Sequence, residues 1–274
     1  MITALTRRFT VDGVSLAWDR WGSDDGTPFL MCHGFSGSTH DFALSIEDFA
    51  QQRPVVAIDH RGHGRSEKLG AVDRYSGGRL AADLIEFIES EVGRPVDLLG
   101  HSMGGAISLR VTLARPDLVR SLILMDTSGW SFVPEDPAMA QLMADFLQAY
   151  DPADGLFTLA PGPEAALIDA ATPVEWQAMK AEMAAGFDPY AFKALGGELF
   201  AHEGMSVRSR LGEISVPVTV VVGENDHPFI GQSAALTAAV PDGQLHVIAG
   251  AYHSPQLTHR AEWVAAIEAH FTRV

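Results

Sequence analysis

The strongest candidate for nucleophilic chemistry is the serine in residues 100–104, which read G-H-S-M-G. An apolar run of strand length, Pro95–Leu99, precedes this G-x-S-x-G pattern, and the helix-like segment Gly105–Arg115 follows it. A serine at the tip of such a strand-to-helix turn needs a strained backbone, and flanking glycines let the strand and the helix approach without a Cβ clash. The start of the helix directs free N–H groups and the positive dipole end toward whatever the serine attacks. We therefore predict that Ser102 is a nucleophile.

A serine hydroxyl also needs a base, and imidazole has a suitable pKa at neutral pH. Catalytic groups in open parallel sheets gather beyond the C-terminal ends of the strands. Among the eleven histidines, this placement favours His33, His227 and His253 over His246 and His270, which fall in a predicted strand and a predicted helix. His253 follows the last predicted strand in a loop, so we predict that it is the base.

The acid that orients the base is predicted at Asp226, directly after the apolar run Val216–Val222. This choice gives the chain order Ser, Asp, His. Asp126, at the end of another predicted strand, is an alternative acid, and Glu224 is a weaker one. His101 adjoins the nucleophile, but neighbours on a sharp turn point in different directions, so we expect a structural role for it.

The elements around these residues alternate between buried strands and amphipathic helices. Such alternation predicts parallel strands covered on both faces, hence a doubly wound α/β sheet. Phe9–Gly13 and Ser15–Trp21 predict an antiparallel pair before it. The other predicted core elements are Phe29–Cys32, Pro54–Ile58, Pro95–Leu99, Ser121–Met125, Val216–Val222 and Gln244–Ile248 as strands, and Ser76–Val92, Gly105–Arg115, Gly231–Ala239 and Gln256–Phe271 as helices.

The alternation stops between residues 129 and 210, where no run resembles a strand. We predict a core domain of residues 1–128 and 211–274, interrupted by a helical cap at 129–210. The predicted cap helices are Ala138–Ala149, Pro163–Ala171, Val174–Ala185 and Tyr190–Phe200.

Composition narrows the range of partners. The formal charge of −16 argues against nucleic acid and anionic membranes, because both require clustered Lys and Arg. The single cysteine, Cys32, excludes an internal disulfide. No apolar run approaches the length that spans a bilayer, and Met1–Val14 contains no apolar leader core, so we expect a cytoplasmic protein.

Several motifs together make the chain resemble an α/β-hydrolase with a helical cap over nearly its whole length. His33-Gly34-Phe35 is similar to the oxyanion-loop motif of that family. Residues 59–66 (DHRGHGRS) resemble its D-x-R-G-x-G-x-S scaffold loop, and residues 223–226 (GEND) resemble its G-x-x-D motif. The resemblance implies a mostly parallel eight-stranded sheet, the triad Ser102, Asp226 and His253, and an oxyanion hole formed by the N–H groups of Phe35 and Met103. Tyr252 departs from the glycine that many relatives carry before the histidine, which alters one wall of the site.

Asp59, His60 and His63 are residue types that bind metals, but the intervening glycines favour a turn, and the resemblance implies no cofactor. Apolar cap residues at helical spacings predict a lid over an apolar substrate. The residues expected to line the pocket are Trp130, Phe132, Met139, Met143, Phe146, Trp176 and Tyr252, and the same apolar set includes Met179, Met183 and Phe187.

The sequence thus favours a serine hydrolase that cleaves a small, fairly apolar carboxylic ester or lactone through an acyl-enzyme. Relatives of this kind also include hydrolases of carbon–carbon bonds in ring-cleavage products, enol-lactonases and a menaquinone-pathway synthase that eliminates pyruvate. The cap shows no arginine cluster for a multiply anionic substrate, and Arg208 and Arg210 lie at its far edge. A slow-turnover ligand receptor is a further alternative, since fold and triad do not choose among functions. The sequence predicts no oligomeric state.

Overall fold

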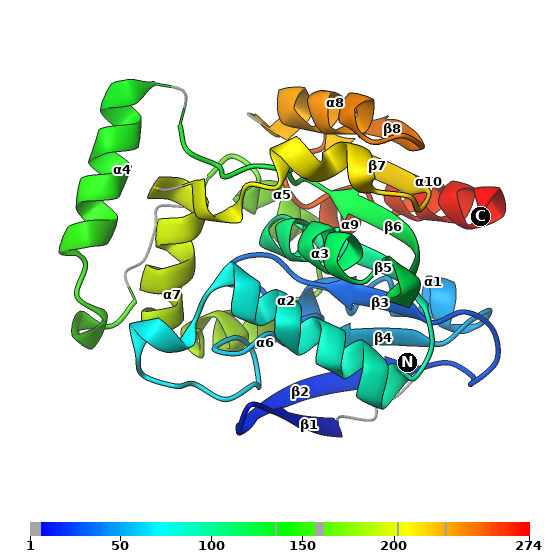
Figure 1. Cartoon of the computed structure of the whole chain (residues 1–274), viewed down its shortest axis with the longest axis horizontal. Helices are drawn as coiled ribbons and strands as arrows, with labels where there is room; N and C mark the ends of the chain where they lie inside the picture. Colours follow the sequence, from blue (N-terminus) through cyan, green and yellow to red (C-terminus); the bar gives the residue numbers. More distant parts are fainter. Residues whose placement is uncertain (1–6, 135, 157–161, 202, 228) are drawn as a thin grey trace.

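The centre of the molecule is an eight-stranded sheet with the order β1-β2-β4-β3-β5-β6-β7-β8 (Figure 1). The computed structural model describes residues 7–134, 136–156, 162–201, 203–227 and 229–274. β1 pairs antiparallel with β2, and β2 with β4, whereas every other neighbouring pair is parallel. This topology confirms the predicted doubly wound, mostly parallel sheet. The strands are β1 Arg7–Val11, β2 Val14–Trp21, β3 Phe29–Cys32, β4 Val55–Ile58, β5 Val96–His101, β6 Val119–Met125, β7 Val218–Gly223 and β8 Gly243–Ile248.

Helices cover both faces of this sheet. The α-helices are α1 Ile46–Ala50, α2 Gly77–Phe87, α3 Met103–Ala114, α4 Pro137–Ala149, α5 Ala165–Ala171, α6 Val174–Ala185, α7 Pro189–Gly196, α8 Phe229–Ala239, α9 Pro255–Thr258 and α10 Arg260–Arg273. Side chains of α2, α3 and α8 join one apolar cluster, and side chains of α1 and α10 join a second. Strands between two such layers are shielded from water on both faces, which explains why β3 and β4 are continuous apolar runs.

The closing segment differs from the prediction of one helix over Gln256–Phe271. It forms two helices, α9 and α10, because His259 between them has φ −134° and ψ 49°, outside the helical region. The break lets α9 lie beside the loop that contains His253, while α10 packs its Trp263 and Ile267 into the second apolar cluster. No helix within the described ranges has the length and apolarity needed to cross a bilayer.

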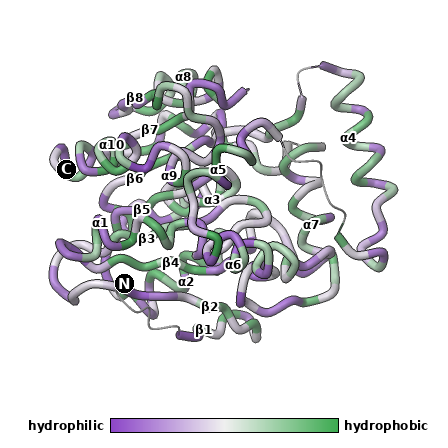
Figure 2. Tube along the Cα trace, turned by 180° about the vertical axis from the view of Figure 1, so that it is seen from behind, coloured by the Kyte–Doolittle hydropathy of each residue, from purple (hydrophilic) through white to green (hydrophobic). Residues whose placement is uncertain are grey.

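In the part of the chain that the structure describes, the α-helices between β6 and β7 are α4 to α7, near the predicted positions. In Figure 1 and, from behind, in Figure 2, α4 lies at one edge of the molecule and α7 lies between it and the core. Hydrophobic residues recur along α4 in Figure 2, and the side chains of Met139, Leu142 and Phe146 are exposed. These inserted helices therefore present apolar surface beyond the core.

A cluster of charged side chains around buried Asp97 lies at the end of β5 that is away from Ser102. The fully buried carboxylate of Asp97 binds Arg53 Nη1 at 2.8 Å and Arg120 Nη2 at 2.6 Å, and it accepts a hydrogen bond from Ser121 Oγ at 2.6 Å. Both arginines reach Asp97 from partly exposed positions. One buried carboxylate thus joins β5, β6 and the segment before β4.

We expect Asp97→Ala to destabilise the protein strongly, because it leaves two arginines without their buried partner. Removing one member of a fully buried ion pair costs about 3–5 kcal/mol, and the cost here should be smaller because both arginines are partly exposed. Urea unfolding would measure it. Asp117→Ala removes an exposed partner of Arg115 and should leave the midpoint unchanged. Equal midpoints for the two variants would contradict a structural role for the Asp97 cluster.

Candidate active site

Ser102 occupies a strained turn between β5 and α3. Its φ of 53° and ψ of −117° lie outside the regions that non-glycine residues favour. Its N–H donates to the carbonyl of Met125 at 2.9 Å, and Thr127 Oγ1 donates to its carbonyl at 2.6 Å. Such a conformation costs on the order of 1–3 kcal/mol and persists because its surroundings fix it. The strain lifts Ser102 out of the strand, at the N-terminus of α3.

The turn at Ser102 is possible because the flanking glycines have no Cβ atom. A Cβ at Gly100 would lie 2.4 Å from the carbonyl oxygen of Gly104, and a Cβ at Gly104 would lie 2.4 Å from that of Cys32. Both distances are well inside van der Waals contact, so the glycines predicted from the motif are required by close backbone approach. Gly34 faces the serine directly, since a Cβ there would lie 3.1 Å from Ser102 Cβ.

We expect Gly100→Ala to displace the Ser102 turn, because its new methyl group would overlap a backbone carbonyl that cannot swing away. Overpacking of this kind costs about 1–3 kcal/mol of stability. The labelling rate of Ser102 by a fluorophosphonate should fall as well. Gly231→Ala on α8 is the matched control, since nothing lies within 4 Å of its added Cβ. Normal labelling in Gly100→Ala would show that the turn tolerates a side chain there.

The predicted base and acid meet in two neighbouring loops. His253 follows β8, Asp226 follows β7, and His253 Nδ1 donates to Asp226 Oδ2 at 2.8 Å. The loops are tied together by the Asn225 N–H, which donates to the Ala251 carbonyl at 2.8 Å, and by the Gly250 N–H, which donates to Glu224 Oε2 at 2.9 Å. Glu224, the weaker alternative acid, thus holds a backbone N–H, and His253 is left with Nε2 available for proton transfer.

Asp126, the other alternative acid, lies close by with a different set of partners. A carboxylate oxygen of Asp126, a carboxylate oxygen of Asp226 and a ring nitrogen of His253 lie within 4.8 Å of one another. Its Oδ1 accepts from the Gly223 N–H at 2.9 Å, and Oδ2 has no hydrogen-bond partner among the described residues. Burial, followed by the nearby charge of Asp226, raises the Asp126 pKa well above its usual range. Asp126 therefore anchors the end of β7, and Asp226 makes the bond to the imidazole.

Two aromatic rings, those of His101 and Phe229, lie against the His253 ring. His101 Nε2 donates to the His253 carbonyl at 2.8 Å, and the two rings lie 4.9 Å apart. Burial, together with repulsion from protonated His253, lowers the His101 pKa to about 3, so this ring stays neutral. The Phe229 ring lies 5.0 Å from the His253 ring on another side. His227 is exposed, next to Asp226 in the chain.

The loop after β3 carries the predicted oxyanion donor Phe35. The neighbouring His33 donates from Nδ1 to the Gly34 carbonyl at 2.9 Å and accepts the His60 N–H at Nε2, at 3.0 Å. Burial lowers its pKa, so His33 acts as a neutral structural link. The Phe35 ring packs against Phe187, Phe192 and Phe200 of the inserted segment. Met103, the other predicted donor, begins α3, where backbone N–H groups have no intrahelical acceptor.

The segment 59–66 positions that loop. The buried Asp59 carboxylate accepts hydrogen bonds from the Thr39 N–H at 2.7 Å and the Arg65 N–H at 3.0 Å. Burial lowers the pKa of His60 and of His63 well below the usual range. Asp59 is thus engaged with backbone groups, an arrangement typical of a scaffold loop.

Two cavities meet at Phe35. One, of about 400 Å³, is lined by His253, His101, Trp176, Lys180 and Gln177, among others. The second, of about 490 Å³, lies against α4 and is lined entirely by apolar side chains, which are Phe35, Met139, Leu142, Met143, Phe146, Leu147, Phe192 and Phe200.

The predicted pocket residues are divided between these cavities and the packed interior. Trp176 lines the first cavity, and Met139, Met143 and Phe146 line the second. Phe132 is buried against Phe200 and Phe229, and Arg208 lies over the Trp130 ring at 4.6 Å. Trp130, Phe132 and Tyr252 line neither cavity.

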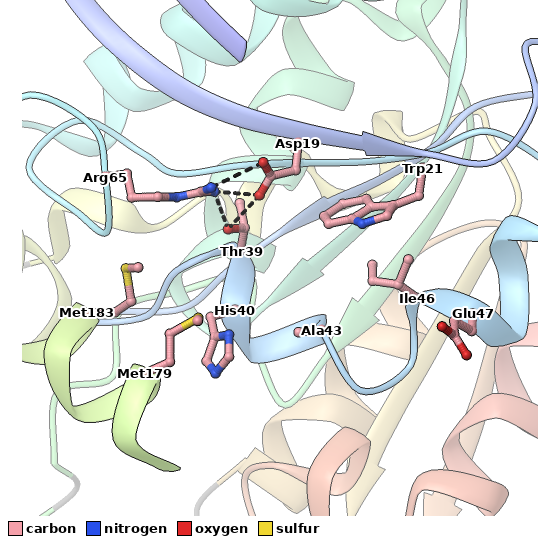
Figure 3. A pocket seen from close by; sticks show the side chains of 10 residues that line it. All are labelled: Asp19, Trp21, Thr39, His40, Ala43, Ile46, Glu47, Arg65, Met179 and Met183. Carbon is pink, nitrogen blue, oxygen red and sulfur yellow. Dashed lines mark hydrogen bonds and ion pairs between the residues drawn. The ribbon is translucent and has the colours of Figure 1, made fainter. Parts of the chain in front are cut away.

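A third cavity, of about 470 Å³, lies away from His253, where α6 faces the core (Figure 3). Its side chains come from α6, with Met179 and Met183, and from core segments that include Asp19, His40 and Arg65. Figure 3 shows the Arg65 guanidinium directed at Asp19 and Thr39, to which it binds. The charges of Arg65 and Asp19 therefore serve to join the strand β2 to the scaffold loop.

The structure also brings to the site two residues that sequence patterns missed. Lys180 of α6 forms an ion pair with Asp41, just after the oxyanion loop, and Glu164, which precedes α5, accepts the Ser254 N–H at 2.6 Å. His40 and Trp176 stack at 5.1 Å beside the first pair. Isolated charges in a helical segment carry no motif, so nothing in the sequence distinguished Lys180 and Glu164 from solvated residues.

The geometry agrees with the comparisons with known proteins. A family profile described as "alpha/beta hydrolase fold" matches residues 27–260, so the chain belongs to the α/β-hydrolase fold family. A pimeloyl-[acyl-carrier protein] methyl ester esterase from Chromobacterium violaceum is 28% identical over 259 residues, which cover 89% of this chain and 94% of that protein.

Among solved structures, the enol-lactonase from Burkholderia xenovorans LB400 has a TM-score of 0.77 at 17% identity, covering 97% of this chain and 100% of that one. A thermophilic esterase from Thermogutta terrifontis has a TM-score of 0.75 at 22% identity, covering 99% and 98%. At such identities the likeness establishes the fold. The chain spans between 32% and 45% of the length of several other curated relatives that it matches.

Proposed function

We propose that this α/β hydrolase is a serine-dependent carboxylic ester hydrolase acting through an acyl-enzyme. The observation that carries the proposal is the 2.8 Å hydrogen bond from His253 Nδ1 to Asp226, beside the strained Ser102 turn at the N-terminus of α3. Acyl transfer needs a serine nucleophile, an oriented imidazole and N–H donors for the oxyanion, and these residues would supply all three.

In the proposed mechanism, Ser102 Oγ attacks the ester carbonyl while His253 Nε2 removes its proton. Asp226 keeps the proton on His253 Nδ1 and stabilises the imidazolium. The N–H groups of Phe35 and Met103 receive the negative charge of the tetrahedral intermediate; one such donor contributes about 100- to 1000-fold to the rate. His253 then protonates the leaving alcohol, and water repeats the cycle on the acyl-serine.

The two cavities that share Phe35 support a substrate with an apolar acyl group. The second cavity, beside α4, would hold that group, since its lining offers no polar partner. The cavity at His253 contains Gln177 and Lys180 and suits a more polar alcohol portion. The inserted segment, residues 129–210, would thus act as the lid that forms the substrate site.

The pyruvate-eliminating alternative finds less support in the charges around the site. Lys180 is the cation that lines the cavity at His253, and it is already paired with Asp41. Arg210 is exposed and binds Glu213, and Arg208 lies over Trp130. A substrate with several carboxylates would meet too little positive charge there.

We expect steady turnover of p-nitrophenyl esters, with an optimum at an intermediate acyl chain length set by the apolar second cavity. Stopped-flow absorbance with acetate, butyrate and octanoate esters would measure the burst and the steady rate. Ser102→Ala should abolish both turnover and fluorophosphonate labelling. A single-equivalent burst that then stalls would favour the receptor alternative, and labelling that persists in Ser102→Ala would remove Ser102 as the nucleophile.

The two neighbouring carboxylates should respond differently to amide substitution. We expect Asp226→Asn to lower kcat on the order of 10⁴-fold, because the amide favours the wrong imidazole tautomer. Asp126→Asn should retain far more activity, since Asn keeps an acceptor for the Gly223 N–H. Circular dichroism would check that both variants are folded. The opposite order of activities would assign the acid to Asp126.

A further inference from the structure

A carboxylate from the inserted segment reaches the loop of the proposed base. Glu164 lies immediately before α5, and its Oε1 accepts the Ser254 N–H at 2.6 Å. Ser254 follows His253 and precedes α9, so this bond fixes the backbone on which the imidazole is mounted. A hydrogen bond to an ionised acceptor is about twice as strong as a neutral one.

Glu164 also faces the charges of the site. Burial raises its pKa, and the positive charge of protonated His253 opposes that rise. An ionised carboxylate at this position attracts the imidazolium that forms while Ser102 attacks the ester. Titratable or charged groups lie on several sides of His253. Asp226 follows β7, Asp126 follows β6, His101 ends β5 and Glu164 precedes α5. The cavity at His253 adds Asp41, Asp169 and Lys180.

We propose that Glu164 is a positioning residue that couples the seating of the inserted helices to the placement and protonation of His253. When the segment sits on the core, the carboxylate holds the Ser254 N–H and adds negative charge near the imidazole. Both effects depend on the contact of the inserted segment with the loop of His253. The inference rests on the proposed function, which gives His253 its role as base.

The test compares Glu164→Gln and Glu164→Ala with the wild-type enzyme. Gln keeps an acceptor oxygen but loses the charge, whereas Ala loses both. The acid limb of the kcat/KM profile should move to lower pH by about half a unit in both variants, because a charge that favours the imidazolium is gone. At the plateau, Glu164→Ala should lose between about tenfold and a hundredfold through misplacement of the base, and Glu164→Gln much less.

Glu175→Gln and Glu175→Ala on α6 are matched controls, since Glu175 is an exposed carboxylate of the same segment. The protonation midpoint of the His253 ring, followed by NMR and assigned with His253→Asn, gives a readout that needs no turnover. A midpoint shifted downward in both Glu164 variants and unchanged in the Glu175 variants supports the proposal. Unchanged midpoints and acid limbs in Glu164→Gln would overturn it, whereas absent esterase activity in the wild type would overturn the proposed function alone.

Discussion

The close approach of β5 and α3 at Ser102 is the constraint on which the rest of the site depends. Two backbones pass so near each other that any Cβ at Gly100 or Gly104 would overlap a carbonyl oxygen. The unfavourable φ of Ser102 persists because β6 and the loop that follows it hold its backbone through the Met125 carbonyl and the Thr127 hydroxyl. The parallel sheet therefore stores the strain that exposes the serine.

Carboxylates of the inserted segment repeatedly bind backbone N–H groups of the core. Asp188 Oδ2 accepts the Leu69 and Gly70 N–H groups at 2.9 and 3.1 Å, and Glu198 accepts the Gly77 N–H at 2.9 Å, at the positive end of α2. Glu164 does the same beside His253. These bonds join the segment to loops and to the start of α2 rather than to strands. The insertion and the loops that shape the site are in this way one connected structure.

The two buried carboxylates near the His253 imidazole, Asp226 and Asp126, differ in their roles because their surroundings differ. Asp226 accepts from His253, whereas Asp126 accepts from the Gly223 backbone, and its raised pKa follows from burial and from the charge of Asp226. Both follow apolar strands in the sequence, so periodicity could only propose them as rivals for one role. The hydrogen bonds that distinguish them depend on how the loops after β6, β7 and β8 fold together.

The sequence by itself determined the doubly wound sheet and the strand–turn–helix around Ser102, because apolar periodicity and glycine spacing act over short distances. It also predicted the acid and base as residues that follow strands. The break at His259, the burial of Phe132 and the approach of Glu164 and Lys180 were decided only by tertiary structure. These features arise from contacts between segments that are far apart in the chain. Local sequence patterns do not show which distant residues will pack against each other.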